Sequence, residues 1–428
     1  MSRAAPRRKE SPEGSRAEDD SGAGLAPFLP YGRQCIEDDD IAAVVAVLKS
    51  ARLTSGPAVE RFEAALAAET KASHAVACAN GTAALHLAAL ALGLDNRSTV
   101  IVPAVTFAAT ANAARYVGAQ VHFADVDPET GLMRPEDLEA ALESLRRSRA
   151  HAVFPVHLGG QVADPPGIAH IARDQGLKIV EDACHALGTN YAGEGRSLSV
   201  GACAHADITV FSFHAMKTVA MGEGGALTTN DPALAARLKR LRNHGAEREA
   251  KHFTLTELAF NSEGRPNPWY YELSELGFNY RASDIACALG ESQLKKLSRF
   301  AGERRRLAEF FEAALERFAP AIRPVKRMPG CVPAWHLFTV LIDFPRFNLE
   351  RAALMARLEA RGIGSQVHYM PLHMHPYYQR HRHEAHDARP LPGAEAYYAR
   401  ALSLPLFVGM SEGDVLRVVD ALAASVGL

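Results

Sequence analysis

The sequence lacks the features of several protein classes. No apolar run among its 428 residues approaches the roughly 20 residues that a membrane-spanning helix needs. A formal net charge of −2 provides no basic surface for nucleic acid or an anionic membrane. The six cysteines contain no CxxC pair, which indicates reduced thiols and a cytoplasmic location. We therefore expect neither nucleic acid nor membrane as a partner.

Residues 1–27 are charged, rich in Gly, Ser and Pro, and poor in large apolar side chains. Such a segment cannot bury enough surface to order itself, so we expect a disordered tail. It also lacks the apolar region of a secretory signal.

Much of the chain alternates short apolar segments with helical patterns, from HAVACANGTAALHLAALAL to GALTTNDPALAARLKRLRNHG. This alternation predicts an α/β fold with a mainly parallel central sheet. We expect a large α/β domain over residues 51–300 and a smaller C-terminal α+β domain over residues 301–428. Residues 28–50 are expected to pack on the small domain, and residues 246–272 to form a long irregular loop.

Ligands of parallel sheets bind beyond the carboxyl ends of the strands. Gly81 and Thr82 open a helix just after an apolar segment. Free N–H groups at a helix start bind phosphate, although the same pattern also makes a plain helix cap. Phe107 follows another apolar segment, where it is either a core aromatic or a flat face for a planar ring.

Two further strand ends carry ionisable side chains. Asp182 closes the segment KIVED and is either a helix cap or the partner of a cationic ligand nitrogen, because an unpaired carboxylate is costly there. Lys217 follows Ser212 in FSFHAMK, before a glycine-rich turn. It either reaches solvent or, in a dry site, loses proton affinity and bonds to an aldehyde. A lysine, a carboxylate, a ring face and phosphate-binding amides are what pyridoxal 5′-phosphate (PLP) requires.

The motifs NGTAAL, PAVTFAATANA, VEDACHALG, FSFHAMKTVAMGEGGALTTND and LGFNYRASDIACALGESQL resemble those of the DegT/DnrJ-type sugar aminotransferases. The resemblance runs from about Tyr31 to the C-terminus. It implies the aspartate-aminotransferase-like fold of PLP-dependent transferases of fold type I. The segments YGRQCI, FSFHAMK, PWYYE and QVHYMPLHMHPYY are most similar to the family members of pseudaminic acid biosynthesis.

The resemblance also implies roles for the candidate residues. Lys217 bonds covalently to the PLP aldehyde and later moves the proton, Asp182 pairs with the pyridine nitrogen, and Phe107 covers one ring face. His185 lies near the phenolic oxygen of the ring. The residues expected at the phosphate are Gly81, Thr82, Ser212 and, from the neighbouring subunit of a homodimer, Asn279.

The same resemblance places the nucleotide sugar and the loop around Asn279. Tyr31, His336 and the ARLT segment match positions that contact the substrate; they are also explained as a surface aromatic, a strand histidine and a plain loop. Arg281 is expected to shape the loop that carries Asn279. The ARLT segment consists of Ala51, Arg52, Leu53 and Thr54.

The predicted reaction moves an amino group from L-glutamate to C4 of UDP-2-acetamido-2,6-dideoxy-β-L-arabino-hexos-4-ulose, a step of pseudaminic acid synthesis. The alternative is C4 or C3 amination of another UDP- or dTDP-keto sugar. A sugar dehydratase relative is expected to replace the lysine with histidine, and a non-catalytic regulatory relative to lose Lys217 or Asp182. The sequence keeps both.

Six histidines lie between His368 and His386. Histidines spaced by one residue can ligate zinc, but no cysteine is near, and QRHRHEAHDARP has the composition of a polar loop. We expect no metal here. His368 and His373 are instead candidates to line the site.

Overall fold

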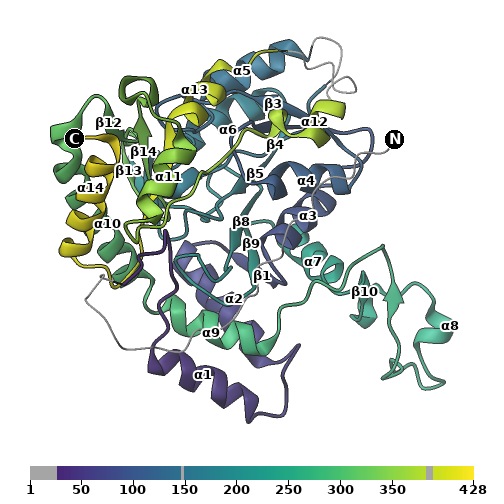
Figure 1. The fold of residues 1–428 in the computed structure, drawn as a ribbon. Coiled ribbons are helices and arrows are strands. Elements are labelled where there is room, and N and C mark those ends of the chain that lie inside the picture. The colour runs from purple at the N-terminus through teal and green to yellow at the C-terminus, as the bar shows by residue number, and fades with distance from the viewer. Residues whose placement is uncertain (1–26, 146–148, 382–388) are drawn as a thin grey trace, which may run out of the picture.

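The computed structural model describes residues 27–145, 149–381 and 389–428 (Figure 1). The predicted disordered tail lies outside the described residues except for Pro27, and so do His383 and His386 of the histidine cluster. In the described ranges, no helix is both long enough and apolar enough to cross a bilayer. All six cysteines are unpaired.

A seven-stranded sheet forms the centre of the molecule, with the strand order β1-β9-β8-β5-β4-β2-β3. The four neighbouring pairs from β8 to β3 are parallel, whereas β9 is antiparallel to both β1 and β8. The predicted mainly parallel sheet is thus confirmed. The strands are β1 (His74–Cys78), β2 (Thr99–Pro103), β3 (Gln120–Ala124), β4 (Ala152–Val153), β5 (Lys178–Asp182), β8 (Ile208–Ser212) and β9 (Gly225–Thr229).

The helices around this sheet begin where the sequence supplies a cap or a proline. The side chains of Asn80, Asp231 and Ser283 accept hydrogen bonds from the first-turn N–H groups of α3, α7 and α9. Proline opens α2, α5, α6 and α7. The helices are α2 (Pro57–Thr70), α3 (Gly81–Ala91), α4 (Ala108–Tyr116), α5 (Pro135–Ser144), α6 (Pro165–Asp174), α7 (Pro232–Leu241) and α9 (Asp284–Leu294).

A three-stranded sheet, β12-β14-β15, lies in the C-terminal part of the chain beside α10 and α14 (Figure 1). The helical patterns in NLERAALMARLEARG and SEGDVLRVVDALAASVG correspond to α11 and α14. The predicted strand AWHLFTVLIDF is shorter in the structure, because β14 begins only at Phe338. The elements are α10 (Leu297–Leu315), β12 (Ile322–Pro324), β14 (Phe338–Ile342), α11 (Arg351–Glu359), α12 (Pro376–His381), α13 (Pro392–Arg400), β15 (Ala401–Leu404) and α14 (Glu412–Val426).

The segment over residues 28–50 divides between two neighbours. Leu29 pairs with Ile363 and so contacts the C-terminal part of the chain. The helix α1 (Asp38–Leu48) packs on α9 instead. Asp40, which is fully buried, accepts hydrogen bonds from Gln293 at 2.7 Å and lies 2.8 Å from Lys296 Nζ. The acidic residues at the start of α1 therefore bind the Lys296 ammonium, between α9 and α10, and also interact with the dipole of their own helix.

Two parts of the chain differ from the sequence expectation. The pattern did not predict the small sheet of β6 (Asn190–Gly193), β7 (Arg196–Ser199) and β13 (Cys331–Val332). The loop expected at 246–272 is an arm that extends from the body (Figure 1). It contains β10 (Ala246–Glu247), a 3₁₀ turn at Ala250–His252, α8 (Thr256–Ala259) and β11 (Glu272–Leu273).

A single carboxylate organises this arm. Glu272 accepts hydrogen bonds from the N–H groups of Thr254 and Leu255 and from the hydroxyls of Thr254 and Tyr270, all at 2.7–2.9 Å. The rings of Phe253 and Tyr270 pack edge to face at 4.8 Å. These contacts join residues far apart along the segment, so no periodic pattern in the sequence announces them.

Asp40→Ala is expected to lower the free energy of unfolding by about 2–3 kcal/mol, because it leaves the Lys296 ammonium without its most buried partner. Chemical denaturation of the full chain measures the change. Asp38→Ala removes an exposed carboxylate from the same turn and is expected to change stability by less than about 0.5 kcal/mol. Equal effects of the two substitutions would contradict this account of α1.

Candidate active site

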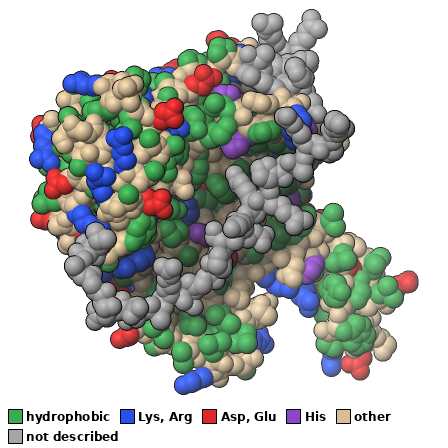
Figure 2. All heavy atoms as spheres, in the orientation of Figure 1, with side chains coloured by type: hydrophobic (Ala, Val, Ile, Leu, Met, Phe, Trp, Pro, Cys, Tyr) green, Lys and Arg blue, Asp and Glu red, His purple; other side chains and the backbone are tan. Residues whose placement is uncertain are grey.

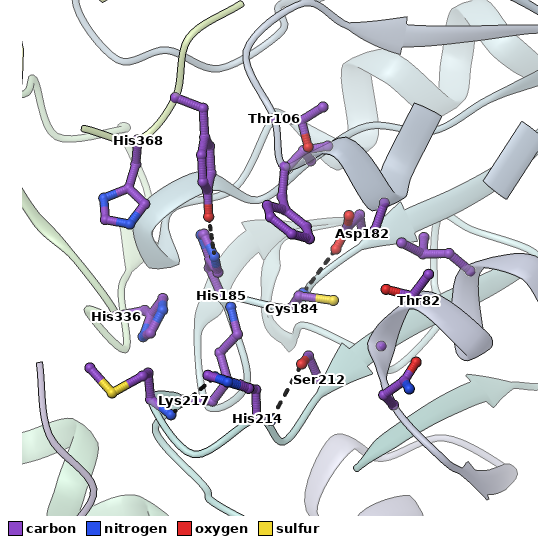
Figure 3. A pocket seen from close by; sticks show the side chains of 18 of the residues that line it. Thr82, Thr106, Asp182, Cys184, His185, Ser212, His214, Lys217, His336 and His368 are labelled. Atoms are coloured by element: carbon purple, nitrogen blue, oxygen red, sulfur yellow. Dashed lines mark hydrogen bonds between the residues drawn. The ribbon is translucent and has the colours of Figure 1, made fainter. Parts of the chain in front are cut away.

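A cavity of about 460 Å³ opens where several strands of the central sheet end (Figure 3). Asp182 is the last residue of β5 and Ser212 the last of β8. Thr106 and Phe107 follow β2 and precede α4. The parallel strands thus deliver their carboxyl ends to one place, as expected for a binding site in an α/β sheet.

Asp182 lies at the base of the cavity with its carboxylate already hydrogen bonded. Its Oδ2 accepts from the Thr110 hydroxyl at 2.7 Å, and its Oδ1 accepts from the Cys184 N–H at 3.2 Å. The Thr110 hydroxyl also lies 2.7 Å from the Thr106 hydroxyl. Asp182 is only 5% exposed, so these donors stabilise a charge that burial alone would disfavour.

Lys217 lies in the turn between β8 and β9 and is half-buried. Burial lowers the pKa of its amine below the ordinary value, against the opposing effects of Cys184 and Asp182 nearby. A lower pKa increases the fraction of unprotonated amine, which is the form that attacks a carbonyl carbon. The lysine is therefore suited to covalent chemistry.

The start of α3 and the end of β8 form a small cup. Asn80 caps α3 by accepting from the Ala83 N–H at 2.8 Å, which leaves the preceding N–H groups of the first turn pointing outward. A Cβ atom on Gly81 would lie 2.8 Å from Ser212 Cβ, so only glycine leaves room between the helix and the strand. Figure 3 shows Thr82 and Ser212 on this side of the cavity.

Histidines and tyrosines line the opposite side (Figure 3). The rings of His185 and His336 lie 4.5 Å apart, and burial holds the pKa of both well below the ordinary value. Burial also lowers the pKa of His368 to about 4. These imidazoles are therefore neutral near pH 7. The Nδ1 atom of His336 is buried without a hydrogen-bond partner among the described residues.

A buried arginine supports this side from behind. Arg304 is 2% exposed and donates to the carbonyl oxygens of Trp335 at 3.4 Å, His336 at 3.3 Å and Leu406 at 2.8 Å. Burial lowers its pKa to about 10. The Leu406 N–H donates in turn to the Tyr31 carbonyl at 3.2 Å. The guanidinium thus holds the backbone of His336 directly and that of Tyr31 through Leu406.

The structure gathers most of the candidate residues that the sequence indicated. The predicted residues that line the cavity are Tyr31, Gly81, Thr82, Phe107, Asp182, His185, Ser212, Lys217 and His336. The predicted residues that lie outside it, exposed on the single chain, are Ala51, Arg52, Leu53, Thr54 and Asn279. Their predicted contacts with ligand remain predictions.

The histidine cluster does not act as one unit. His368 lines the cavity and contacts the Ser403 hydroxyl at 2.9 Å. The suggestion that His373 lines the site is wrong, since its ring lies beside Phe123 and its Nε2 is 3.5 Å from a Glu395 oxygen. Within the described ranges, no group of three or more His, Cys, Asp or Glu side chains is arranged to hold a metal ion.

Sequence analysis missed several residues of the site. Thr106, Thr110 and Arg304 carry no local signal, because a threonine in a helix start and an arginine on a long helix are common. Tyr369 lies next to the cavity histidine His368, and its place in QVHYMPLH was the one available indication.

The residues present fit PLP. The buried Asp182 carboxylate has its donors in place on the protein side, and the cup at Gly81 would be filled by any Cβ atom. Phe107 lines the cavity and is 58% exposed, so its ring is available to stack on a planar ring. Asp182 would hold the pyridine nitrogen, the cup the phosphate, and Lys217 the aldehyde carbon.

The neutral histidines make stability depend on pH. An unfolded chain binds a proton at His368 below about pH 6.5, whereas the folded chain does so only near pH 4. The unfolded state therefore binds more protons between these values, and the free energy of unfolding falls as the pH drops through this window. Between pH 7 and pH 5, His368 alone is expected to lower the free energy of unfolding by about 2 kcal/mol.

Denaturation of the wild type and of His368→Gln at both pH values measures this contribution. Glutamine keeps a hydrogen-bonding group beside Ser403 but does not titrate. Between pH 7 and pH 5, the free energy of unfolding of the variant is therefore expected to fall by about 2 kcal/mol less than that of the wild type. An identical pH dependence in the two proteins would show that His368 is not held neutral.

Comparisons with known proteins identify the family of the chain. Residues 34–423 match the sequence profile of the DegT/DnrJ/EryC1/StrS aminotransferase family. The spore coat polysaccharide biosynthesis protein SpsC of Bacillus subtilis is 37% identical over 395 residues, which are 92% of this chain and 96% of that protein.

Solved structures give the same result. PseC of Helicobacter pylori, an aminotransferase involved in the biosynthesis of pseudaminic acid, has a TM-score of 0.81 and 27% identity over 93% of this chain and 99% of its own. DesI, solved in the presence of its TDP-sugar product, has a TM-score of 0.78 and 31% identity, and the match covers 94% of this chain and 93% of DesI. The expected fold type I is thereby confirmed. The chain belongs to the DegT/DnrJ/EryC1/StrS family of PLP-dependent sugar aminotransferases.

Proposed function

We propose that this enzyme transfers an amino group from L-glutamate to C4 of a UDP-linked 4-keto-6-deoxy-N-acetylhexosamine, UDP-2-acetamido-2,6-dideoxy-β-L-arabino-hexos-4-ulose. The observation that carries the proposal is one cavity in which a lysine of lowered pKa, a buried carboxylate and a phosphate cup converge. The net reaction exchanges the amino group of glutamate for the carbonyl oxygen of the sugar, which yields 2-oxoglutarate and an amino sugar.

PLP, when bound, supplies the aldehyde that carries the amino group and the ring that accepts electrons from the substrate carbon. The protein supplies position and proton transfer. Thr110 and the Cys184 N–H hold the Asp182 carboxylate in place by hydrogen bonds, so that it would pair with the ring nitrogen. In the first half-reaction, Lys217 takes a proton from the α-carbon of glutamate. In the second, it delivers a proton to C4 of the sugar. Its lowered pKa allows the amine to act as a base as well as an acid.

The neutral side of the cavity suits the second substrate. A keto sugar carries no charge at its reacting end, so it needs hydrogen-bond donors and acceptors more than cations. The imidazole of His336 and the phenol of Tyr31 line this side of the cavity and can supply such groups. Similarity to PseC supports the pseudaminic acid pathway, while similarity to DesI makes a dTDP-keto sugar the second candidate.

We further propose that the active enzyme is a homodimer with shared sites. Asn279 and the segment 51–54 are exposed on the single chain, as a role in a neighbouring site requires. Apolar side chains are also exposed on α1 and around the arm, where Figure 2 shows hydrophobic surface, and such patches mark interfaces. These side chains include Ile41, Leu48, Leu258, Trp269 and Leu276, of which Leu276 is 85% exposed. The cytoplasmic location remains a prediction.

A panel of keto sugars tests the reaction. Purified enzyme is mixed with glutamate and one UDP- or dTDP-linked 4-keto or 3-keto sugar, and mass spectrometry detects the amino sugar. We expect the highest kcat/KM with the UDP-linked 4-keto-6-deoxy-N-acetylhexosamine. Product from dTDP sugars alone would move the assignment to the second candidate.

Lys217→Ala is the catalytic control for this panel. We expect it to lower kcat by at least about 10⁴-fold and to abolish the cofactor absorbance that borohydride reduction removes from the wild type. Lys178→Ala removes a 54% exposed lysine at the far end of β5 and is expected to leave both unchanged. A wild-type protein that binds no PLP would refute the proposal.

Complementation tests the shared site. In a mixed dimer of Lys217→Ala and Asn279→Ala chains, one site carries both changes and the other carries neither. Coexpression is therefore expected to restore about a quarter of wild-type activity, since about half of the dimers are mixed. Lys217→Ala coexpressed with Asp182→Ala places one fault in each site and is expected to restore none. Equal activity in both pairs would contradict the shared site.

A further inference from the structure

His185 has both ring nitrogens in hydrogen bonds, and these determine its tautomer. The Gly159 N–H donates to Nδ1 at 3.3 Å. A backbone N–H can only donate, so Nδ1 must carry a lone pair. Because burial and the nearby Lys217 charge hold the pKa of His185 well below its ordinary value, the ring is neutral and has one proton. That proton must lie on Nε2.

The tautomer of His185 determines the direction of the Tyr369 hydroxyl. Nε2 of His185 lies 3.4 Å from Tyr369 Oη, and since Nε2 carries the proton, it donates and the phenol oxygen accepts. The phenolic hydrogen must therefore point elsewhere. No second protein partner of Oη is found in the described ranges, so this hydrogen remains available to a ligand.

Tyr369 lies at the reacting end of the cavity. Its ring centroid is 5.9 Å from that of Phe107, the side chain placed to cover the cofactor ring. Its ring also lies 6.2 Å from that of His185, nearly parallel to it. Burial raises the pKa of Tyr369, and the nearby Asp182 and Cys184 raise it further. The phenol therefore keeps its proton near neutral pH, where it can act as a hydrogen-bond donor.

Resting on the proposed function, we propose that Tyr369 is a catalytic residue whose hydroxyl donates a hydrogen bond to the carbonyl oxygen of the keto sugar, and that His185 is the residue that positions it. Negative charge develops on that oxygen when a nitrogen attacks the carbonyl carbon. A fixed donor in a water-poor site stabilises this charge without reorganisation. The glutamate half-reaction begins at an amino group and forms its carbonyl only when 2-oxoglutarate is released, so its early steps do not use this donor.

Separate half-reactions test the role of Tyr369. Tyr369→Phe removes one oxygen and keeps the ring, and it is expected to slow the keto-sugar half-reaction about 10²–10³-fold. The glutamate half-reaction is expected to change by less than about threefold. Tyr398→Phe, at a ring that packs on Arg351, is the control and is expected to change neither. An equal effect on both half-reactions, or no effect, would overturn the assignment.

The positioning by His185 has its own readout, which does not depend on activity. Nitrogen-15 spectra of the cofactor-free protein at pH 7 are expected to show His185 neutral and protonated on Nε2, with a shift of that nitrogen in Tyr369→Phe. Protonation on Nδ1, or on both nitrogens, would overturn the inference even if the proposed function is correct. A correct tautomer in a protein without transaminase activity would instead refute the proposed function.

Two substitutions of His185 complete the test. The side-chain amide of His185→Gln can accept from Gly159 and donate to Tyr369, whereas His185→Leu can do neither. The glutamine variant is expected to keep the keto-sugar rate within about tenfold of the wild type, and the leucine variant to fall to the level of Tyr369→Phe. Equal losses in the two variants would show that the hydrogen bonds of His185 do not orient the phenol.

Discussion

The site depends on one buried carboxylate. Asp182 ends a strand of the sheet interior, where an ionised oxygen is unfavourable unless donors meet it. Those donors come from α4, through Thr110, and from the turn that follows β5, through the Cys184 N–H. The hydrogen bonds that stabilise Asp182 therefore form only when β2, α4 and β5 are correctly aligned. Asp182 would carry the charge that the ring nitrogen of PLP requires. The same alignment holds Phe107, at the start of α4, on the wall of the cavity.

The two sides of the cavity around Asp182 differ in polarity. The cup formed by α3 and Ser212 offers backbone amides and a hydroxyl, which suit a phosphate. The opposite side offers neutral imidazoles and phenols, kept uncharged by burial. The guanidinium of Arg304, which supports that side, is bonded to backbone carbonyl oxygens.

The sequence was informative where chemistry is encoded locally. Gly81, Asp182, Ser212 and Lys217 each stand at the end of an apolar segment, and parallel strands bring such ends together. The partners of these residues were not predictable, because Thr110 and Tyr369 reach the cavity only through tertiary contacts. The arm was missed for a similar reason, since its order comes from bonds to Glu272 and not from a repeating pattern. Asn279 and the ARLT segment lie outside the cavity of the single chain, and their predicted contacts belong to the homodimer that we propose.

The carboxylate that organises the arm has a consequence for acid tolerance. Its four hydrogen bonds lower the pKa of Glu272 to about 2, from an ordinary value of 4.5. The stabilisation that it provides is therefore complete above that ordinary value and is lost only as the pH falls toward 2. The histidines of the cavity begin to favour the unfolded chain at a much milder acidity. Acid would thus weaken the catalytic pocket first, while the projecting arm still holds its shape.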